Sequence, residues 1–472
     1  MRVVSTARWL WAALWLTGLA CAGDAPGLRW GFDERIRQDV FNHIPVRLDP
    51  PGEARYGMNN YLRFRTRVWL EADPAERLTL RARAVEEFRL YRYPEPKPEA
   101  QRANYQFPDE LVFDNLWLEA RDLAGGLWDV RVGRQDLRYG NGRILSDGTP
   151  KDGSRTTYFD ALKVTWKGWT DLKLDLLGLY NPPLDKLAIH SADRDLTGYT
   201  SSANDDHITD SGAGAYLMVN RWTDCPLEFY GFYQHQTAWE QSAPKDKEGR
   251  YLPAAAGQVL DEARGLLENG ALDRGTCGFR VVPQFSKQLT GTLEAAIQFG
   301  QKGDADILAC LVDVGVTNQI PVLREFQPAV FVSLYFLSGS APGSGRISGW
   351  HPPWARDSQD SRITSFTFDT EGYYEWSNLL RPTVGLQCTP HPRLTTLVTG
   401  SYLAAPEADG SGGGHERGWL GQFNGDFVLA EGLFDRHDKL TGVLLLQVLK
   451  PGDYYDANPT AYAFRWQLKY DF

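Results

Sequence analysis

The last twelve residues of the chain, Ala461 to Phe472, alternate in polarity with a period of two. In a strand, side chains alternate between faces. One face would carry Tyr462, Phe464, Trp466, Leu468, Tyr470 and Phe472, and the other Ala463, Arg465, Gln467, Lys469 and Asp471. An apolar, aromatic face opposite an ionic face is typical of a transmembrane antiparallel β-barrel, whose outside meets lipid and whose inside meets water. The segment therefore predicts an all-β fold of this class.

The beginning of the chain indicates export from the cytoplasm. Arg2 and Arg8 precede an apolar run from Trp9 to Leu19, and Ala20-Cys21-Ala22 fits the small-x-small pattern of a signal peptidase site. We therefore predict a signal peptide over residues 1–22, a barrel over 23–472 and a location in the cell outer membrane.

Two other membrane attachments are less favoured. Cys21 would suit a lipoprotein signal, but Gly18 stands where such a signal usually has leucine. After Ala22 no apolar run approaches the roughly 20 residues that a membrane-spanning helix needs. The chain is therefore not expected to cross the membrane with helices.

Composition agrees with a barrel and disfavours several functions. The chain has 46 Gly, 21 Tyr and 16 Trp but only 3 Met, which favours strands and turns. Without Arg2 and Arg8, 48 basic residues remain against 60 acidic ones, so nucleic-acid binding is disfavoured. The four cysteines after Cys21 form no CxxC pair, and we predict no metal site and no cofactor.

Alternation and turn chemistry predict about eighteen strands, an even number as expected of a bacterial barrel. Their predicted centres are Arg35, Arg65, Arg83, Trp117, Arg131, Lys163, Leu174, Leu217, Tyr230, Phe279, Leu293, Val312, Val332, Leu386, Leu397, Phe423, Leu445 and Trp466.

The connections between these strands alternate between short and long. The short ones are 73–76, 123–126, 168–170, 223–224, 286–288, 390–392 and 434–438, and the long ones are 91–108, 138–157, 181–212, 238–272, 339–379 and 404–418. In a barrel the short turns would be periplasmic and the long loops extracellular. The connections near 301–305 and 318–325 fit this rule less well. The loop 339–379 is rich in aromatic residues and could pack on itself or into the pore mouth.

Arginines recur on one face of the first strands. Because an arginine facing lipid near the midplane costs roughly 2–4 kcal/mol, these side chains are expected to face the lumen. The last strand must pair with the first to close the barrel, which adds its basic residues to the same side. The predicted basic wall comprises Arg35, Arg37, Arg63, Arg65, Arg67, Arg81, Arg83, Arg131, Arg465 and Lys469.

This basic wall has two interpretations. Guanidinium groups could draw anionic solutes into a pore, since they stay charged and grip carboxylates through two hydrogen bonds. Alternatively, arginines and acids could form cross-strand ladders that brace a wide barrel, as Arg83 and Glu87 could with their neighbours. The excess of arginine over acid on the first three strands favours the first interpretation.

A further segment carries a family resemblance. Val132 to Arg143, then Asp152 to Arg155 and Phe159 to Lys163, is similar to the "GRQ…YGDGR…R…FDA" signature of the alginate export family of outer-membrane proteins, and Phe32 to Arg37 resembles its first strand. Asn141 stands where the motif often has aspartate. The resemblance implies an eighteen-stranded barrel that passes an anionic polyuronate outward through an arginine-lined constriction.

The resemblance also implies site residues and partners. Arg134, Arg143 and Arg155 match the motif, with Asp160 as the ion partner. Arg134 lies on the opposite parity from Arg131, so a bulge at Gly133 would be needed to turn it inward. The expected partners are outer-membrane lipid, an anionic solute or polysaccharide such as alginate and, for export, a periplasmic protein.

The sequence also bears on other function classes. A porin for unrelated small solutes and a structural or adhesive barrel remain open from sequence. An outer-membrane enzyme is less favoured, because His190, Ser191, Asp193 and His207 share a polar loop without a GxSxG motif. A gated receptor would need a plug domain before the barrel, and the first predicted strand begins soon after residue 22. We therefore expect a channel and not an enzyme.

Overall fold

The computed structural model describes most of the chain after the predicted signal peptide. The described residues are 27–45, 58–93, 110–146, 158–182, 187–191, 208–242, 257–264, 266–341, 343–355, 363, 376–456 and 459–472. The predicted signal peptide lies outside them. Among them, no helix is both long and apolar enough to cross a bilayer.

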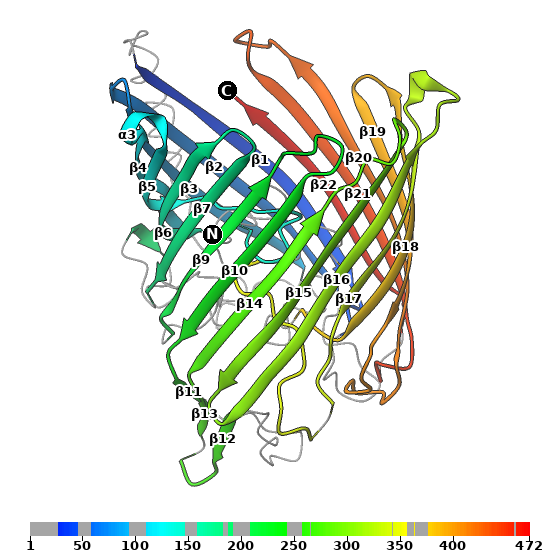
Figure 1. The fold of residues 1–472 in the computed structure, drawn as a ribbon. Helices are drawn as coiled ribbons and strands as arrows, with labels where there is room; N and C mark the ends of the chain where they lie inside the picture. The colour runs from blue at the N-terminus through cyan, green and yellow to red at the C-terminus, as the bar shows by residue number, and fades with distance from the viewer. Residues whose placement is uncertain are drawn as a thin grey trace, which may run out of the picture.

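The chain forms one closed antiparallel barrel (Figure 1). Its eighteen strands are β1 (Leu28–Asn42), β2 (Asn59–Ala75), β3 (Leu78–Tyr93), β4 (Glu110–Asp122), β5 (Trp128–Gln135), β6 (Phe159–Trp169), β7 (Leu172–Asn181), β9 (Asp210–Val219), β10 (Leu227–Gln236), β14 (Leu272–Val281), β15 (Leu289–Lys302), β16 (Ala305–Gln319), β17 (Ala329–Leu337), β18 (Leu379–His391), β19 (Leu394–Ala404), β20 (Glu416–Glu431), β21 (Lys439–Pro451) and β22 (Ala461–Asp471). Each of the eighteen predicted centres lies in one of these strands, so the predicted fold class is confirmed.

The barrel closes between its first and last strands. β1 pairs with β22 from Asp33↔Asp471 to Asn42↔Tyr462. At the end of this seam the ring of Phe32 stacks on that of Phe472, with 5.3 Å between centroids. Closure leaves no unpaired sheet edge, which is the condition for a sheet to span hydrocarbon.

The two ends of the barrel differ as the sequence predicted. One end has short connections, including a four-residue helical turn α3 (Leu123–Gly126) and a 3-10 turn η1 (Arg324–Phe326). The long connections lie at the other end. The two exceptions flagged from sequence are real: β15 and β16 join through a tight turn at the long-loop end, and the longer 320–328 connection lies at the short-turn end.

Four short strands were not predicted. β11 (Trp239–Ser242), β12 (Gln258–Asp261) and β13 (Leu266–Asn269) form a small sheet beyond the barrel at the long-loop end. β8 (Ala188–Ser191) pairs with β4 at 110–112, next to the stretch where β4 pairs with β5. β8 therefore extends the wall beyond the end of β5.

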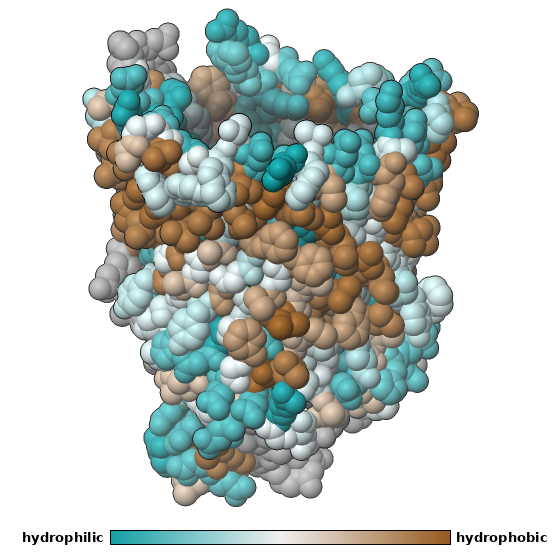
Figure 2. All heavy atoms as spheres, in the orientation of Figure 1, coloured by the Kyte–Doolittle hydropathy of each residue, from teal (hydrophilic) through white to brown (hydrophobic). Residues whose placement is uncertain are grey.

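Burial alternates along the strands with the period seen in the sequence. On β1, Asp33, Arg35, Arg37 and Asp39 are buried on the lumen side, while the residues between them face outward. Figure 2 shows the outer surface on the visible face, where a belt of hydrophobic residues lies between hydrophilic ends. The wall thus separates a polar interior from an apolar exterior.

Candidate functional site: the charged lumen

The arginines of β1, β2 and β3 face the lumen in ion pairs. Arg65 and Arg67 both donate to the carboxylate of Asp33, each at 2.6 Å. Across the closing seam, Arg465 donates to Asp39 at 2.6 Å, and Arg37 lies 2.9 Å from the same carboxylate. These groups come from different strands, so the pairs tie β22, β1 and β2 together.

Glu87 of β3 is a second shared carboxylate. It accepts a hydrogen bond from Arg63 and lies 3.9 Å from an Nη atom of Arg35 and 3.7 Å from Nε of Arg89. Arg35 and Glu87 are 2% and 3% exposed, so this cluster is almost entirely shielded from water. These contacts are cross-strand pairs of arginine and acid, the kind described by the ladder interpretation of the basic wall.

Arg83 owes its partners to a break in strand alternation. The register between β3 and β4 shifts at Arg83/Ala84, and both Asp114 and Asn115 are buried there. Arg83 donates to Asp114 at 2.7 Å and to Asp136 at 3.0 Å. A bulge admits one extra residue to a strand, and here it delivers a carboxylate to the lumen side.

Three cations of the predicted basic wall are more accessible to water than the others. The side chains of Arg81, Arg131 and Lys469 are 23%, 28% and 26% exposed. Arg81 donates to Glu71 and Arg131 to Glu119, each at 2.8 Å, and Lys469 pairs with Asp471. Their acids lie on the same or a neighbouring strand, which leaves part of each cation facing the open lumen.

Arg134 does not join the basic wall. Pairing runs unbroken through Gly133 between β4, β5 and β6, so no bulge turns Arg134 inward. It holds Asp160 through two bonds of 2.8 and 3.0 Å, donates to the Phe113 carbonyl, and lies 3.9 Å from the Tyr158 ring centroid. Its side chain is only 2% exposed.

After β5 the chain leaves the wall and crosses the lumen. The segment Asp136–Ser146, which we call the crossing loop, carries Arg143 to the far side, where Nε donates to Asp313 of β16 at 2.9 Å. The Arg143 guanidinium also lies 4.1 Å from the ring centroid of Tyr335 on β17. Gly140 and Gly142, at φ +52° and +75°, make the turn that allows this path.

A second long loop packs against the crossing loop. The Trp354 amide donates to the Ile144 carbonyl at 3.0 Å, and the Ser146 amide donates to the Trp354 carbonyl at 2.9 Å. The Trp354 indole donates to Asp210 at 3.2 Å. Trp350, Trp354 and Trp376 are all buried, so the described part of the aromatic 339–379 loop folds inward, the second of the two arrangements predicted for it.

The wall opposite the arginines is lined by acids and tyrosines. Tyr139 donates to Asp175 at 2.7 Å, and Tyr230 donates to Glu294 at 3.1 Å. The rings of Tyr139 and Tyr216 stack with 4.4 Å between centroids, and Tyr216 also donates to Glu228. Cations are present on this side as well, since Lys163 lies 3.1 Å from Asp175 and Arg280 lies 2.9 Å from Glu228. The two sides therefore differ in the tyrosines that bind the carboxylates of this wall.

The remaining predicted residues cannot be placed in this site. Arg155, Asp193 and His207 lie outside the described residues, and only the backbone of His190 and Ser191 is described, in β8. Within the described part of the chain, no group of three or more His, Cys, Asp or Glu side chains could hold a metal ion.

Sequence reasoning missed the carboxylates that complete the site. Asp114, Asp136 and Asp313 were not singled out, although each binds a predicted arginine. Asp114-Asn115 breaks the alternation of β4, and two adjacent polar residues in a strand are a usable sign of a bulge. Asp313 lies 170 residues from Arg143, and no local pattern links them.

Comparisons with known proteins agree with this architecture. Similar solved structures from Pseudomonas aeruginosa include OccK5 (OpdH), with 11% identity, 94% of this chain and 98% of that chain covered, and a TM-score of 0.54. OccK2 (OpdF) in complex with glucuronate, from the same organism, has 11% identity, 94% and 96% coverage and a TM-score of 0.55. A BenF-like porin from Pseudomonas fluorescens Pf-5 has 11% identity, 95% and 100% coverage and a TM-score of 0.58. These likenesses show a shared fold.

No curated protein matches the sequence significantly. The family model described as alginate export matches residues 28–463, which is almost the whole barrel. The match spans the strands from β1 to β21 and the crossing loop. This chain therefore belongs to the alginate export family and is an outer-membrane β-barrel with a porin-like fold.

Proposed function

We propose that this barrel is a channel for carboxylated anions, with a polyuronate such as alginate as the largest member of the class. The observation that carries the proposal is the accessible cationic set, Arg81, Arg131 and Lys469, on the arginine-rich side of the lumen. Cations in a confined lumen raise the local concentration of anions, and arginine can exchange one carboxylate partner for another.

The buried ion pairs have a different role in this proposal. Arg35, Arg37 and Arg65 are nearly inaccessible and already share carboxylates. They hold the wall in shape and supply a background potential, while the accessible set contacts the solute. Family membership and the structural similarity to a barrel crystallised with glucuronate, a uronate, support this class of solute.

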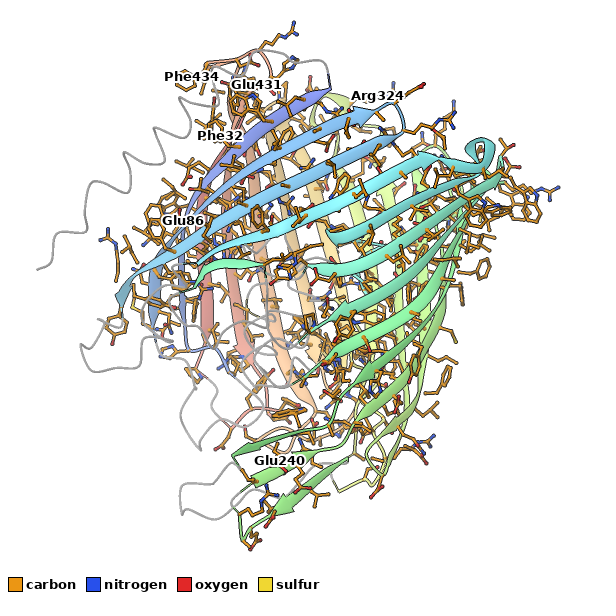
Figure 3. All side chains as sticks on the ribbon, turned by 90° about the vertical axis from the view of Figure 1, so that its left-hand side faces the viewer. Phe32, Glu86, Glu240, Arg324, Glu431 and Phe434 are labelled. Atoms are coloured by element: carbon orange, nitrogen blue, oxygen red, sulfur yellow. The ribbon has the colours of Figure 1, made fainter. Side chains whose placement is uncertain are left out.

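The test is ion selectivity in a planar bilayer. We expect the native channel to prefer anions, and the Arg81→Gln/Arg131→Gln variant to shift its reversal potential toward cations, most strongly at low salt because screening weakens the effect. Arg324→Gln is the matched control, since Arg324 lies in the exposed η1 turn (Figure 3). A cation-selective native channel, or unchanged selectivity in the folded double variant, would refute the proposal.

A second measurement addresses the polymer. Oligouronates added to the bilayer should block the current in proportion to their length, whereas neutral oligosaccharides of equal length should block it less. Equal block by both would favour the alternative, a general porin for unrelated small solutes. A folded barrel with no conductance under any condition would favour the structural or adhesive alternative.

A further inference from the structure

A short sequence occurs twice on the lumen wall. Trp-Leu-Glu-Ala occupies residues 69–72 on β2 and again residues 117–120 on β4. Leu70 and Leu118 are exposed on the outer face, so the alternation of each strand turns the tryptophan and the glutamate of each copy into the lumen. The repeat therefore places the same two side chains on two strands of the same wall.

The first copy forms a compact unit with an arginine of β3. Arg81 is the register partner of Glu71 and donates to its carboxylate at 2.8 Å. The guanidinium carbon of Arg81 also lies 4.9 Å from the ring centroid of Trp69. A Cβ at Gly31 would lie 2.7 Å from the Trp69 indole, so the glycine leaves the ring room to lie against β1. One unit thus combines an aromatic ring, a cation and an acid.

The second copy repeats this unit with β5. Arg131 is the register partner of Glu119 and donates to it at 2.8 Å. Its guanidinium carbon lies 4.2 Å from the ring centroid of Trp117. Trp117 is 8% exposed, whereas the Arg131 side chain is 28% exposed. The indole therefore lies beneath the cation, and the cation is the part that a solute can reach.

A third unit has the same chemistry without the repeated sequence. The Lys163 ammonium of β6 lies 3.1 Å from Asp175 of β7 and 5.5 Å from the ring centroid of Tyr139 in the crossing loop. The Tyr139 hydroxyl donates to the same carboxylate at 2.7 Å. An aromatic ring, a cation and an acid again lie together, and here the ring belongs to the loop that crosses the lumen.

The three units form one row. Arg81 is the register partner of Trp117, and Arg131 is the register partner of Lys163. Neighbouring strands are about 4.8 Å apart, so successive units lie within the length of a short pyranose chain. Because the strands are tilted (Figure 1), a row across β2 to β6 also advances along the pore axis, and this one ends at the crossing loop. The aromatic–cation row, as we call it, comprises Trp69, Arg81, Trp117, Arg131, Lys163 and Tyr139 with the acids Glu71, Glu119 and Asp175.

Each unit offers hydrogen-bond donors beside an acceptor. The cations carry only N–H donors, and the paired acids carry only acceptor oxygens when ionised. A plain carboxylate gains a hydrogen bond from the cation but is repelled by the acid, whereas a sugar acid can also donate its hydroxyls to that acid. The ring beside each cation limits where its N–H groups lie, which favours a ligand whose charges are equally fixed. A pyranose chain with a carboxylate on each ring has that property.

We propose that the aromatic–cation row is a binding track for chains of sugar acids. This role rests on the proposed function and narrows its solutes from carboxylated anions to hydroxylated ones. Carboxylates of the chain accept hydrogen bonds from Arg81, Arg131 and Lys163, and its hydroxyls donate to the paired acids. Trp69 and Trp117 are positioning residues, since they act through the arginines that they hold. Binding several units at once gives a chain an affinity that one unit alone does not supply.

Two blockers of equal charge test the track in planar bilayers. Trigalacturonate and tricarballylate carry the same number of carboxylates, but only trigalacturonate has rings and hydroxyls. The native channel should be blocked by trigalacturonate at the lower concentration. Trp69→Leu/Trp117→Leu should reduce this preference about fivefold, the scale of one cation–π contact, while the reversal potential stays native because no charge changes. Trp419→Leu, on the outer face of β20 and 62% exposed, is the matched control and should leave the preference unchanged.

The results distinguish the track from the proposed function. A native channel that does not prefer anions refutes the proposed function and the track with it. An anion-selective channel that both compounds block equally overturns the track alone, as does an undiminished preference in the double variant. Trp69→Leu alone should lower the preference about twofold and serves where the double variant does not fold. A native preference in this single variant, or no recovery in Trp69→Tyr, would also overturn the track.

Discussion

At the scale of single residues, the lumen is governed by shared carboxylates. The Asp33 carboxylate binds two guanidinium groups from a neighbouring strand, and all three side chains are largely shielded from water. Removing one partner of a buried pair leaves the other charge uncompensated, which typically costs about 3–5 kcal/mol. The acids are therefore as important to the wall as the arginines.

We expect Asp33→Asn to lower the free energy of unfolding by about 3 kcal/mol, since it removes the negative charge that Arg65 and Arg67 share. Glu431→Gln is the control: its partner Lys439 is 3.3 Å away, both side chains are about half exposed, and such pairs contribute about 0–1 kcal/mol. Urea unfolding from lipid vesicles, followed by tryptophan fluorescence, measures both. Equal destabilisation by the two substitutions would contradict the assignment.

A second residue prediction concerns the turn between β20 and β21. Burial alone would raise the pKa of Asp438, but its carboxylate accepts hydrogen bonds from the amides of Phe434, Asp435 and Leu433 and from the Tyr470 hydroxyl, and the net effect lowers the pKa to about 2. A lowered pKa means that the ionised form is favoured by folding.

The resulting stability is present above pH 4 and is lost as the pH falls toward 2. Asp438→Asn should remove this part of the pH dependence, because asparagine does not ionise. Hydrogen exchange of the 433–438 amides, measured from pH 5 to pH 2, should show the turn opening in the native chain. An identical pH profile in the variant would show that other groups cause the opening.

At the scale of elements, the crossing loop is fixed at both ends. It begins directly after β5, in which Gly133 has φ +118° and a Cβ would meet the Leu116 carbonyl oxygen at 2.2 Å. At the far side Arg143 donates to Asp313 of β16. Leu137, Ile144 and Leu145 of the loop are also buried in the hydrophobic cluster, and the ion pair of Arg143 adds a polar contact to the far wall. A segment that loses such a contact can change its position on channel timescales.

We therefore expect Arg143→Gln to increase the open-channel current and its fluctuations in single-channel recordings, because the loop loses its bond to Asp313. Arg264→Gln, in the exposed 262–264 segment beyond the barrel, should leave the current unchanged. A quieter channel, or one of native conductance, would show that the other contacts of the crossing loop, including those with the 343–355 segment, hold it in place.

The strands could be predicted from sequence, whereas the path of the crossing loop could not. In each strand, polar and apolar residues alternate because the two faces meet different surroundings. The eighteen centres could therefore be predicted without tertiary information. The crossing loop instead depends on contacts such as Leu145 with Trp354, more than two hundred residues apart. β8 is four residues long, too short for a period-two pattern to be recognised.

At the scale of the whole molecule, an apolar belt encloses a lumen lined with ion pairs. The refolded chain in detergent should give a β-rich circular dichroism spectrum and migrate faster on a gel when unheated, since a closed barrel pairs every strand. A mainly helical spectrum would contradict the fold. This prediction needs no knowledge of the solute, so it separates failure of the fold from failure of the proposed function.

The seam between β1 and β22 also determines when the molecule can be completed during biosynthesis. The bond from Arg465 to Asp39 joins residues 426 positions apart. The first strand is synthesised long before its final neighbour exists, and contacts between such distant residues form slowly. Until synthesis ends, β1 keeps an unpaired edge that could bind other chains. The newly made protein must therefore be kept from aggregating for the whole period between the first strand and the last.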